Sequence, residues 1–294
     1  LLSPAWPLGA RAYGPEGETF LKVTLPAMYR AADTHPQVLA KLNGVRAQVG
    51  LDAVRSTTHE RRHVVAQAAL FPDWYAPPAG DWPEMECMGF PLPTSAEALP
   101  ERLREFLSRF PRPLVFTPGT SVGQPERFFD AAIDCCAELG MPAIFLSPFL
   151  KPRHRSLGES IVHFEHIELG TLLRHAALLV HHGGMGTTAR ALQAPIPQVI
   201  SPFHFDQFDN GHRVEVLGAG SVVPREKLNG KNLAAAVQKL LSDSAVESRL
   251  TAYCAAIAHA RAIERCADLL ERVWRNTPLH PEPLQFKPSL QQQQ

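Results

Sequence analysis

The sequence lacks the features that identify metal proteins, nucleic-acid-binding proteins and membrane proteins. Its five cysteines show neither metal-ligand nor redox spacing, which favours reduced thiols in the cytoplasm. Lys and Arg total 29, as do Asp and Glu, so the zero net charge gives no electrostatic footprint for nucleic acid. No apolar run approaches the roughly 20 residues that a membrane-spanning helix needs. The first residues also lack the charged segment and the cleavage site of a signal peptide.

From Pro113 onward, short apolar runs alternate with helical patterns. The runs at 113–119, 142–147, 160–165, 176–182, 197–201 and 220–223 predict strands. Helices are predicted at 125–140, 170–174, 187–194, 206–217 and within 230–275. Because the strands are continuously apolar and alternate with helices, we expect an α/β fold with a doubly wound parallel sheet covered on both faces.

Before residue 100 the pattern is mixed. Residues 17–33 and 35–51 carry helical spacing of apolar residues, and 64–71 predicts a short buried strand. Residues 72–93 are rich in proline and aromatic residues, which predicts a loop packed onto a surface. We therefore divide the chain into residues 1–100, residues 101–276 and an unstructured tail at 277–294.

The stretch "ALLVHHGGMGTTARAL" ends a buried strand in two histidines and then removes side chains at Gly183, Gly184 and Gly186. Glycines let the backbone approach a ligand closely, and a helix starting near Thr187 would point free N–H groups into the same space. Such a combination binds anions, most naturally phosphate. A histidine at its rim, His182, could donate a hydrogen bond to a phosphate oxygen. His181 is interpreted as a packing residue.

Asp206 and Gln207 follow one helix and one strand later, so the chain has returned to the same edge of the sheet. A carboxylate beside an amide can accept from and donate to the hydroxyls of a polyol. Phosphate and polyol recognition on one edge suggests a sugar nucleotide. The motif "HFEH" at 163–166 invites a zinc interpretation, but two histidines alone do not make a site.

The segment "HHGGMGTTARAL…SPFHFDQFDNGHRVEVLGAG" resembles the donor-binding signature of family 1 glycosyltransferases of the GT-B fold, and the likeness covers nearly the whole chain. The stretches "LNGVRAQVGL" and "LFPDWYAPPAGDWPEMECMGFPL" are similar to the bacterial branch that includes the rhamnosyltransferase chain of rhamnolipid synthesis. The resemblance implies that residues 101–276 form a Rossmann-like donor domain and that residues 1–100 are a remnant of the acceptor domain. It also implies a UDP or dTDP sugar donor and neither a cofactor nor a metal.

Site residues follow from the same resemblance. The residues implied to hold the donor diphosphate are His182, Gly184, Gly186 and Thr187. Asp206 and Gln207 would bind the sugar, while Thr120, Ser121 and His166 would line the donor site.

This chain departs from the family pattern at several positions. His166 and Glu168 replace the aromatic residue and the proline near the nucleotide base, and Arg190 replaces the ribose-binding glutamate of plant members. Pro195 replaces a glycine that closes the helix; because proline cannot supply a positive φ, we expect that helix to end differently. No catalytic base is recognised, and the resemblance places the base upstream of Leu1.

The expected reaction is an inverting, metal-independent transfer of a hexose or deoxyhexose to a small apolar or lipid-like acceptor that carries a hydroxyl group. Two alternatives remain open. The chain could bind nucleotide sugars without chemistry of its own and need a partner chain for the acceptor domain. It could also be an epimerase, although no catalytic carboxylates beyond Asp206 support that activity.

Overall fold

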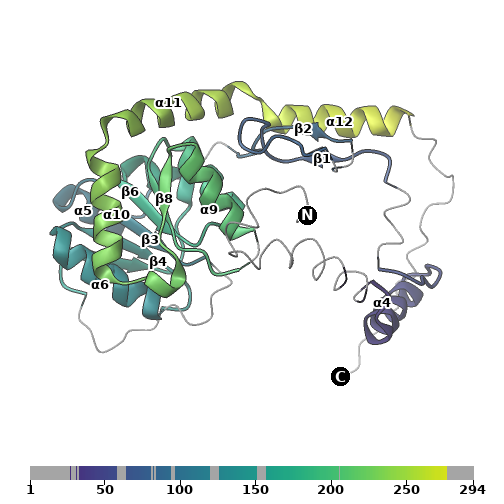
Figure 1. Ribbon diagram of the computed structural model, residues 1–294, viewed down its shortest axis with the longest axis horizontal. Helices are drawn as coiled ribbons and strands as arrows, with labels where there is room; N and C mark the ends of the chain where they lie inside the picture. The colour runs from purple at the N-terminus through teal and green to yellow at the C-terminus, as the bar shows by residue number, and fades with distance from the viewer. Residues whose placement is uncertain are drawn as a thin grey trace. The chain divides into compact units, whose positions relative to one another are not determined.

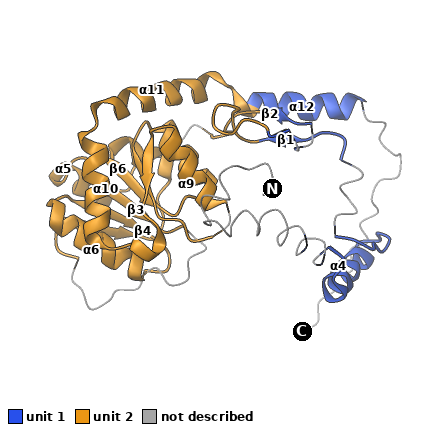
Figure 2. Ribbon diagram, viewed as in Figure 1, with its two compact units in different colours: residues 1–69, 79–86, 264–294 blue, residues 70–78, 87–263 orange. Residues whose placement is uncertain are grey.

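The computed structural model describes residues 27, 31, 33–57, 64–80, 82, 84–93, 97–119, 126–150, 157–204 and 206–276. The chain divides into two compact units, which are coloured separately in Figure 2. One unit holds residues 1–69, 79–86 and 264–294, and the other holds residues 70–78 and 87–263.

The smaller unit contains few regular elements among its described residues. Helix α4 (Pro36–Gln48) confirms the helix expected at 35–51, although it buries no side chain. The buried strand expected at 64–71 is wrong, since only β1 (Ala68–Ala69) is extended and it pairs with the equally short β2 (Glu86–Cys87). Val64 and Val65 before it are exposed. Most of the helix expected at 17–33, and the whole tail expected at 277–294, lie outside the described residues.

The larger unit is built on a parallel sheet of six strands in the order β5-β4-β3-β6-β7-β8 (Figure 1). The strands are β3 (Leu114–Thr117), β4 (Ala143–Leu146), β5 (Ile161–Phe164), β6 (Leu178–His181), β7 (Gln198–Ile200) and β8 (Gly220–Val222). All six coincide with the apolar runs of the sequence. The doubly wound parallel sheet is therefore confirmed.

Successive side chains of the strands enter two separate hydrophobic cores. In β3, Leu114 and Phe116 belong to one core, whereas Val115 belongs to the other. In β6, Val180 and Leu179 divide in the same way. Because side chains alternate across a strand, continuous apolar runs of this kind require both faces of the sheet to be covered.

Helices on both faces supply the other halves of these cores. The first core takes side chains from α6 (Glu126–Leu139), α9 (Gln207–Val216), α10 (Gly230–Ser242) and α11 (Ser244–His259). The second takes them from α5 (Glu101–Arg109), α7 (Leu169–Leu172) and the 3-10 turn Leu173–His175. Helix α8 (Met185–Gln193) contributes to both cores. The 3-10 turn Arg225–Lys227 and α12 (Ala262–Asn276) complete the described elements.

Helix α8 begins earlier than expected, at Met185, two residues before the predicted Thr187. At its other end, the Ile196 N–H donates to the Ala191 carbonyl at 3.2 Å, the six-to-one bond of a Schellman motif. Pro195 has no N–H group, so the five-to-two bond that a glycine at this position would supply is missing. The helix end thus differs from the glycine-closed pattern, as expected.

Two parts of the proline-rich segment before residue 100, residues 72–78 and 87–93, belong to the larger unit. Tyr75 and Phe90 are buried in the first core, and Trp74 stacks on Tyr253 with ring centroids 5.0 Å apart. The packing expected of the aromatic loop is thus confirmed for these two parts, whose aromatic residues enter the core of the unit. The sequence boundary near residue 100 does not coincide with the compact units, because residues 70–78 and 87–100 lie with the sheet. In the described part of the chain, no helix is long and apolar enough to span a membrane.

Candidate functional site

A pocket of about 320 Å³ opens at the carboxyl ends of β3, β4, β5 and β6. The chain runs from β3 outward through β4 and β5, and then returns to β6 on the other side of β3. The crevice between β3 and β6 is therefore the point where the strand order reverses, which is where open α/β sheets bind their ligands.

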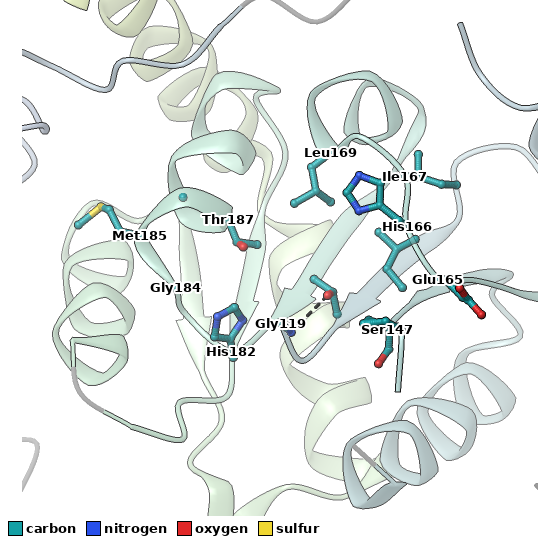
Figure 3. Close-up of a pocket in the computed structure, with 14 residues that line it drawn as sticks. Gly119, Ser147, Glu165, His166, Ile167, Leu169, His182, Gly184, Met185 and Thr187 are labelled. Carbon is teal, nitrogen blue, oxygen red and sulfur yellow. Dashed lines mark hydrogen bonds between the residues drawn. The ribbon is translucent and has the colours of Figure 1, made fainter. Parts of the chain in front are cut away.

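His182 lies in this crevice, between the loop after β3 and the first turn of α8 (Figure 3). A Cβ atom on Gly119 would stand 2.5 Å from the His182 Cε1 atom, and one on Gly184 would stand 2.5 Å from its Nε2 atom. Gly119 also has a φ of +81°, which side chains rarely adopt. The imidazole therefore fits only because both neighbours are glycines.

The His182 ring is 9% exposed, and its Nδ1 atom is buried without a hydrogen-bond partner among the described residues. Burial lowers the pKa of His182, and the negative charge of Asp206 partly opposes this shift. The imidazole is therefore neutral at pH 7, with one protonated nitrogen that can donate a hydrogen bond, while Nδ1 is enclosed and has no partner among the described residues.

His181 stabilises the glycine loop that follows β6. Its Nδ1 atom accepts the Gly183 N–H at 3.1 Å, and its Nε2 atom lies 2.9 Å from the Gln198 side-chain oxygen, so its proton sits on Nε2. Full burial lowers the pKa of His181 to about 3, with the neighbouring His182 adding to the shift. A neutral imidazole with both nitrogens engaged is a structural group, as the sequence suggested.

The first turn of α8 faces the pocket. Gly184 is its N-cap residue, and the first bond within the helix joins the Thr188 N–H to the Gly184 carbonyl at 2.9 Å. The N–H groups of residues 185–187 have no carbonyl one turn earlier, and the helix dipole adds positive potential there. A Cβ on Gly186 would meet nothing within 4 Å, so the backbone is open at that position.

The amino end of α9 packs against the same loop. A Cβ on Gly183 would stand 2.9 Å from the Gln207 carbonyl oxygen, and the Asn210 amide donates to the Gly183 carbonyl at 2.9 Å. The Gln207 side-chain oxygen accepts the N–H groups of Phe203 at 2.8 Å and His204 at 3.0 Å. The Gln207 side chain therefore stabilises the turn that precedes α9. The Asp206 side chain, in contrast, is exposed.

Five of the nine predicted site residues line the pocket: His182, Gly184, Gly186, Thr187 and His166. Asp206 and Gln207 do not line it, although their helix begins against its glycine loop. Thr120 and Ser121 lie outside the described residues. The roles assigned to all nine stay predictions.

Sequence reasoning missed Ser147 and Glu165, which line the pocket beyond β4 and β5. Each is the last residue of a predicted strand, so the rule that parallel strands end at one edge could have found them.

Arg190 and Glu168, two positions that depart from the family pattern, contact each other. Their side chains form an ion pair at 3.3 Å, and Arg190 also donates to the Pro93 carbonyl at 2.8 Å. The Glu168 carboxylate accepts the Thr171 N–H at 2.7 Å and so caps α7. The side chains at both positions therefore bond to neighbouring residues of the fold. Among the described residues, no group of three or more His, Cys, Asp or Glu is arranged to hold a metal ion.

Residues 143–263 match the family described as erythromycin biosynthesis protein CIII-like, C-terminal domain. A sterol 3-beta-glucosyltransferase of Kluyveromyces lactis is 32% identical over 133 residues, which cover 42% of this chain and 11% of that protein. The O-mycaminosyltylonolide 6-deoxyallosyltransferase of Streptomyces fradiae is 36% identical over 107 residues, which cover 36% of this chain and 25% of that protein. The chain thus spans a quarter or less of the length of these two relatives.

Among solved structures, the glycotransferase of kitacinnamycin has a similar fold. It superposes with a TM-score of 0.67 at 21% identity, over 87% of this chain and 67% of that chain. The α/β fold of the GT-B type that the sequence predicts is therefore confirmed.

Proposed function

We propose that this chain carries the donor site of a glycosyltransferase that moves a hexose or deoxyhexose from a nucleotide diphosphate sugar to an apolar, hydroxyl-bearing acceptor. One observation carries the proposal: the His182 imidazole, buried and with an unsatisfied nitrogen, lies beside the open first turn of α8 at the reversal point of the sheet. The relatives named above are sterol glucosyl- and deoxyallosyltransferases, which supports a sugar nucleotide as the ligand.

The diphosphate would occupy the α8 end of the pocket. The free N–H groups of Gly186 and Thr187 would donate to its oxygens, and His182 would add a further donor. When the glycosidic bond breaks, negative charge grows on the leaving diphosphate. Fixed donors and the helix dipole would stabilise this charge, so we propose a transfer that needs no metal ion.

The sugar would extend from the diphosphate towards the amino end of α9. Asp206 is exposed there, and the amino end of α9 packs against the glycine loop that follows His182, so a hexose attached to a phosphate beside His182 would come within reach of this carboxylate. The side-chain oxygen of Gln207 already accepts two backbone N–H groups, which leaves the side-chain N–H groups to donate to a sugar oxygen. His166, at the β5 end of the pocket, would contact the nucleoside.

An inverting transfer requires the acceptor oxygen to attack the anomeric carbon in line with the departing diphosphate. The sugar passes through a state with oxocarbenium character, and a general base must take the acceptor proton. We assign this base to none of the described residues. A deoxyhexose donor and a lipid-like acceptor follow from the likeness to the rhamnosyltransferase branch and belong to the proposal.

Calorimetric titration with UDP and TDP tests the donor site. The chain should bind at least one of them, and His182→Ala should weaken that binding about 10- to 100-fold, because a hydrogen bond to a charged group contributes about 1.5–3 kcal/mol. The far-UV circular dichroism spectrum should not change. His175→Ala is the matched control, since His175 is exposed outside the pocket. Absence of binding by both nucleotides, or equal losses in the two variants, would refute the proposal.

A further inference from the structure

Tyr75 belongs to the loop segment 70–78 but reaches into the core of the larger unit. Its side chain is 2% exposed, and its ring packs edge-on against Phe90 with centroids 5.2 Å apart. Its hydroxyl group donates to the side-chain oxygen of Asn210 at 2.9 Å, across 135 positions of sequence. Burial, reinforced by the charge of Asp209, raises the pKa of Tyr75 far above its ordinary value, so the hydroxyl remains protonated.

Asn210 connects this hydroxyl group to the candidate site. The residue is 1% exposed, and its amide nitrogen donates to the Gly183 carbonyl at 2.9 Å and to the Asp206 carboxylate at 3.0 Å. Both amide hydrogens are thereby used, and the amide oxygen is left for Tyr75. A rotated amide would place its oxygen against two acceptors, so the three contacts permit one orientation.

We propose that Tyr75 is a positioning residue for the sugar-binding carboxylate: acting through Asn210, it fixes the orientation of Asp206 towards the donor sugar. This inference rests on the proposed function, because it takes Asp206 as a ligand of the donor hydroxyls. The sequence signature includes Asp206 and Asn210 but gives no indication of Tyr75.

The two groups held by Asn210 depend on it to different degrees. Gly183 is also held through its N–H group by His181, and it packs against Ile200 and Gln207. The Asp206 side chain does not cap α9, and within the described residues Asn210 is its hydrogen-bond partner. Loss of the Tyr75 hydroxyl should therefore disturb Asp206, which contacts the sugar, more than the loop that contacts the phosphates.

The test measures how much the sugar adds to binding. Calorimetry gives the Kd of UDP and UDP-glucose, and of TDP and TDP-glucose. The sugar-dependent gain is the Kd of the nucleoside diphosphate divided by the Kd of its nucleotide sugar. The pair for which the unmodified chain shows the larger gain is used. In Tyr75→Phe this gain should fall about five- to tenfold, while the Kd of the nucleoside diphosphate stays within about twofold. A purely structural role would weaken both ligands together.

Tyr253→Phe is the matched control. Its hydroxyl group donates to the Leu217 carbonyl at 3.0 Å, at the other end of α9, so the variant also removes one partly buried hydrogen bond. Its sugar-dependent gain should equal that of the unmodified chain. An equal loss in both tyrosine variants would overturn the inference.

The Asp206→Ala background tests whether Tyr75 acts through Asp206. In that background Tyr75→Phe should cause no further loss of the sugar-dependent gain, whereas a further five- to tenfold loss would show that Tyr75 acts elsewhere. If the unmodified chain binds neither nucleotide, the proposed function fails and takes this inference with it. If it binds and Tyr75→Phe keeps the full gain, the inference alone is wrong.

Discussion

At the scale of single residues, the candidate site is shaped by small neighbours around one large side chain. The sequence pattern predicts that Gly183, Gly184 and Gly186 expose the backbone to a ligand, but of these three only Gly186 is open in that way. Gly119 and Gly184 instead make room for the His182 ring. The site therefore depends on a glycine 63 positions before the histidine it accommodates, as their residue numbers show.

Gly119→Ala should weaken diphosphate binding at least about tenfold, because the new Cβ would displace the His182 imidazole. It should also lower the free energy of unfolding by about 1–3 kcal/mol, since φ at this position is positive. Gly140→Ala is the control, because Gly140 has a φ of +62° with nothing within 4 Å of its Cβ position. Urea unfolding and calorimetry would check both variants. Equal binding by the two would contradict this account of His182.

His181 should make the fold sensitive to acid. Its pKa of about 3 in the folded chain lies below the ordinary value near 6.5, so its contribution to stability is complete above pH 6.5 and declines as the pH falls towards 3. Between pH 7.5 and pH 5 this group should remove about 2 kcal/mol from the free energy of unfolding. Urea titrations at the two pH values measure the change.

His181→Gln should be less stable at pH 7.5 but should lose less stability on acidification. His175→Gln, in which an exposed histidine is replaced, should keep the full pH dependence. Parallel curves for the unmodified chain and His181→Gln would show that other groups cause the acid sensitivity.

At the scale of elements, the strands and helices of the larger unit could be predicted because local pattern and tertiary packing agree. Residues 143–146 are apolar throughout, and alternate side chains of this run enter the two cores. The structure starts α8 two residues before the predicted start, because its first turn includes Gly186 despite the low helix propensity of glycine. The run at 64–71 misled because only part of it is buried: Ala69 is 4% exposed, whereas Val65 is 64% exposed.

The candidate site could be predicted in part from the same patterns. Strand ends and the α8 start bring His182 and Thr187 to one edge of the sheet, and that reasoning uses only local periodicity and topology. The support beneath them could not be predicted. The Tyr75 to Asn210 bond joins residues that no periodicity relates, and the space that Gly119 provides for His182 depends on the register of neighbouring strands.

At the scale of the whole molecule, the sheet and its helices do not form a closed core by themselves. Tyr75, Met88 and Phe90 are 2%, 1% and 4% exposed, and they come from segments before the boundary that sequence patterns place near residue 100. Arg213 on α9 reinforces this attachment, since it donates to the Tyr75 carbonyl at 3.2 Å and forms a buried ion pair with Asp209 at 2.6 Å. The loop segment is thus part of the donor-side fold.

Two shortened chains distinguish the sequence boundary from the boundary of the core. Residues 64–294 retain Tyr75 and Phe90 and should melt cooperatively and bind nucleoside diphosphate as the full chain does. Residues 101–294 should show no cooperative transition, because loss of a buried aromatic side chain costs about 3–5 kcal/mol and a domain has only about 5–15 kcal/mol in total. Scanning calorimetry measures both. If residues 101–294 melted at the midpoint of the longer chain, the core would end near residue 100, where the sequence pattern places the boundary.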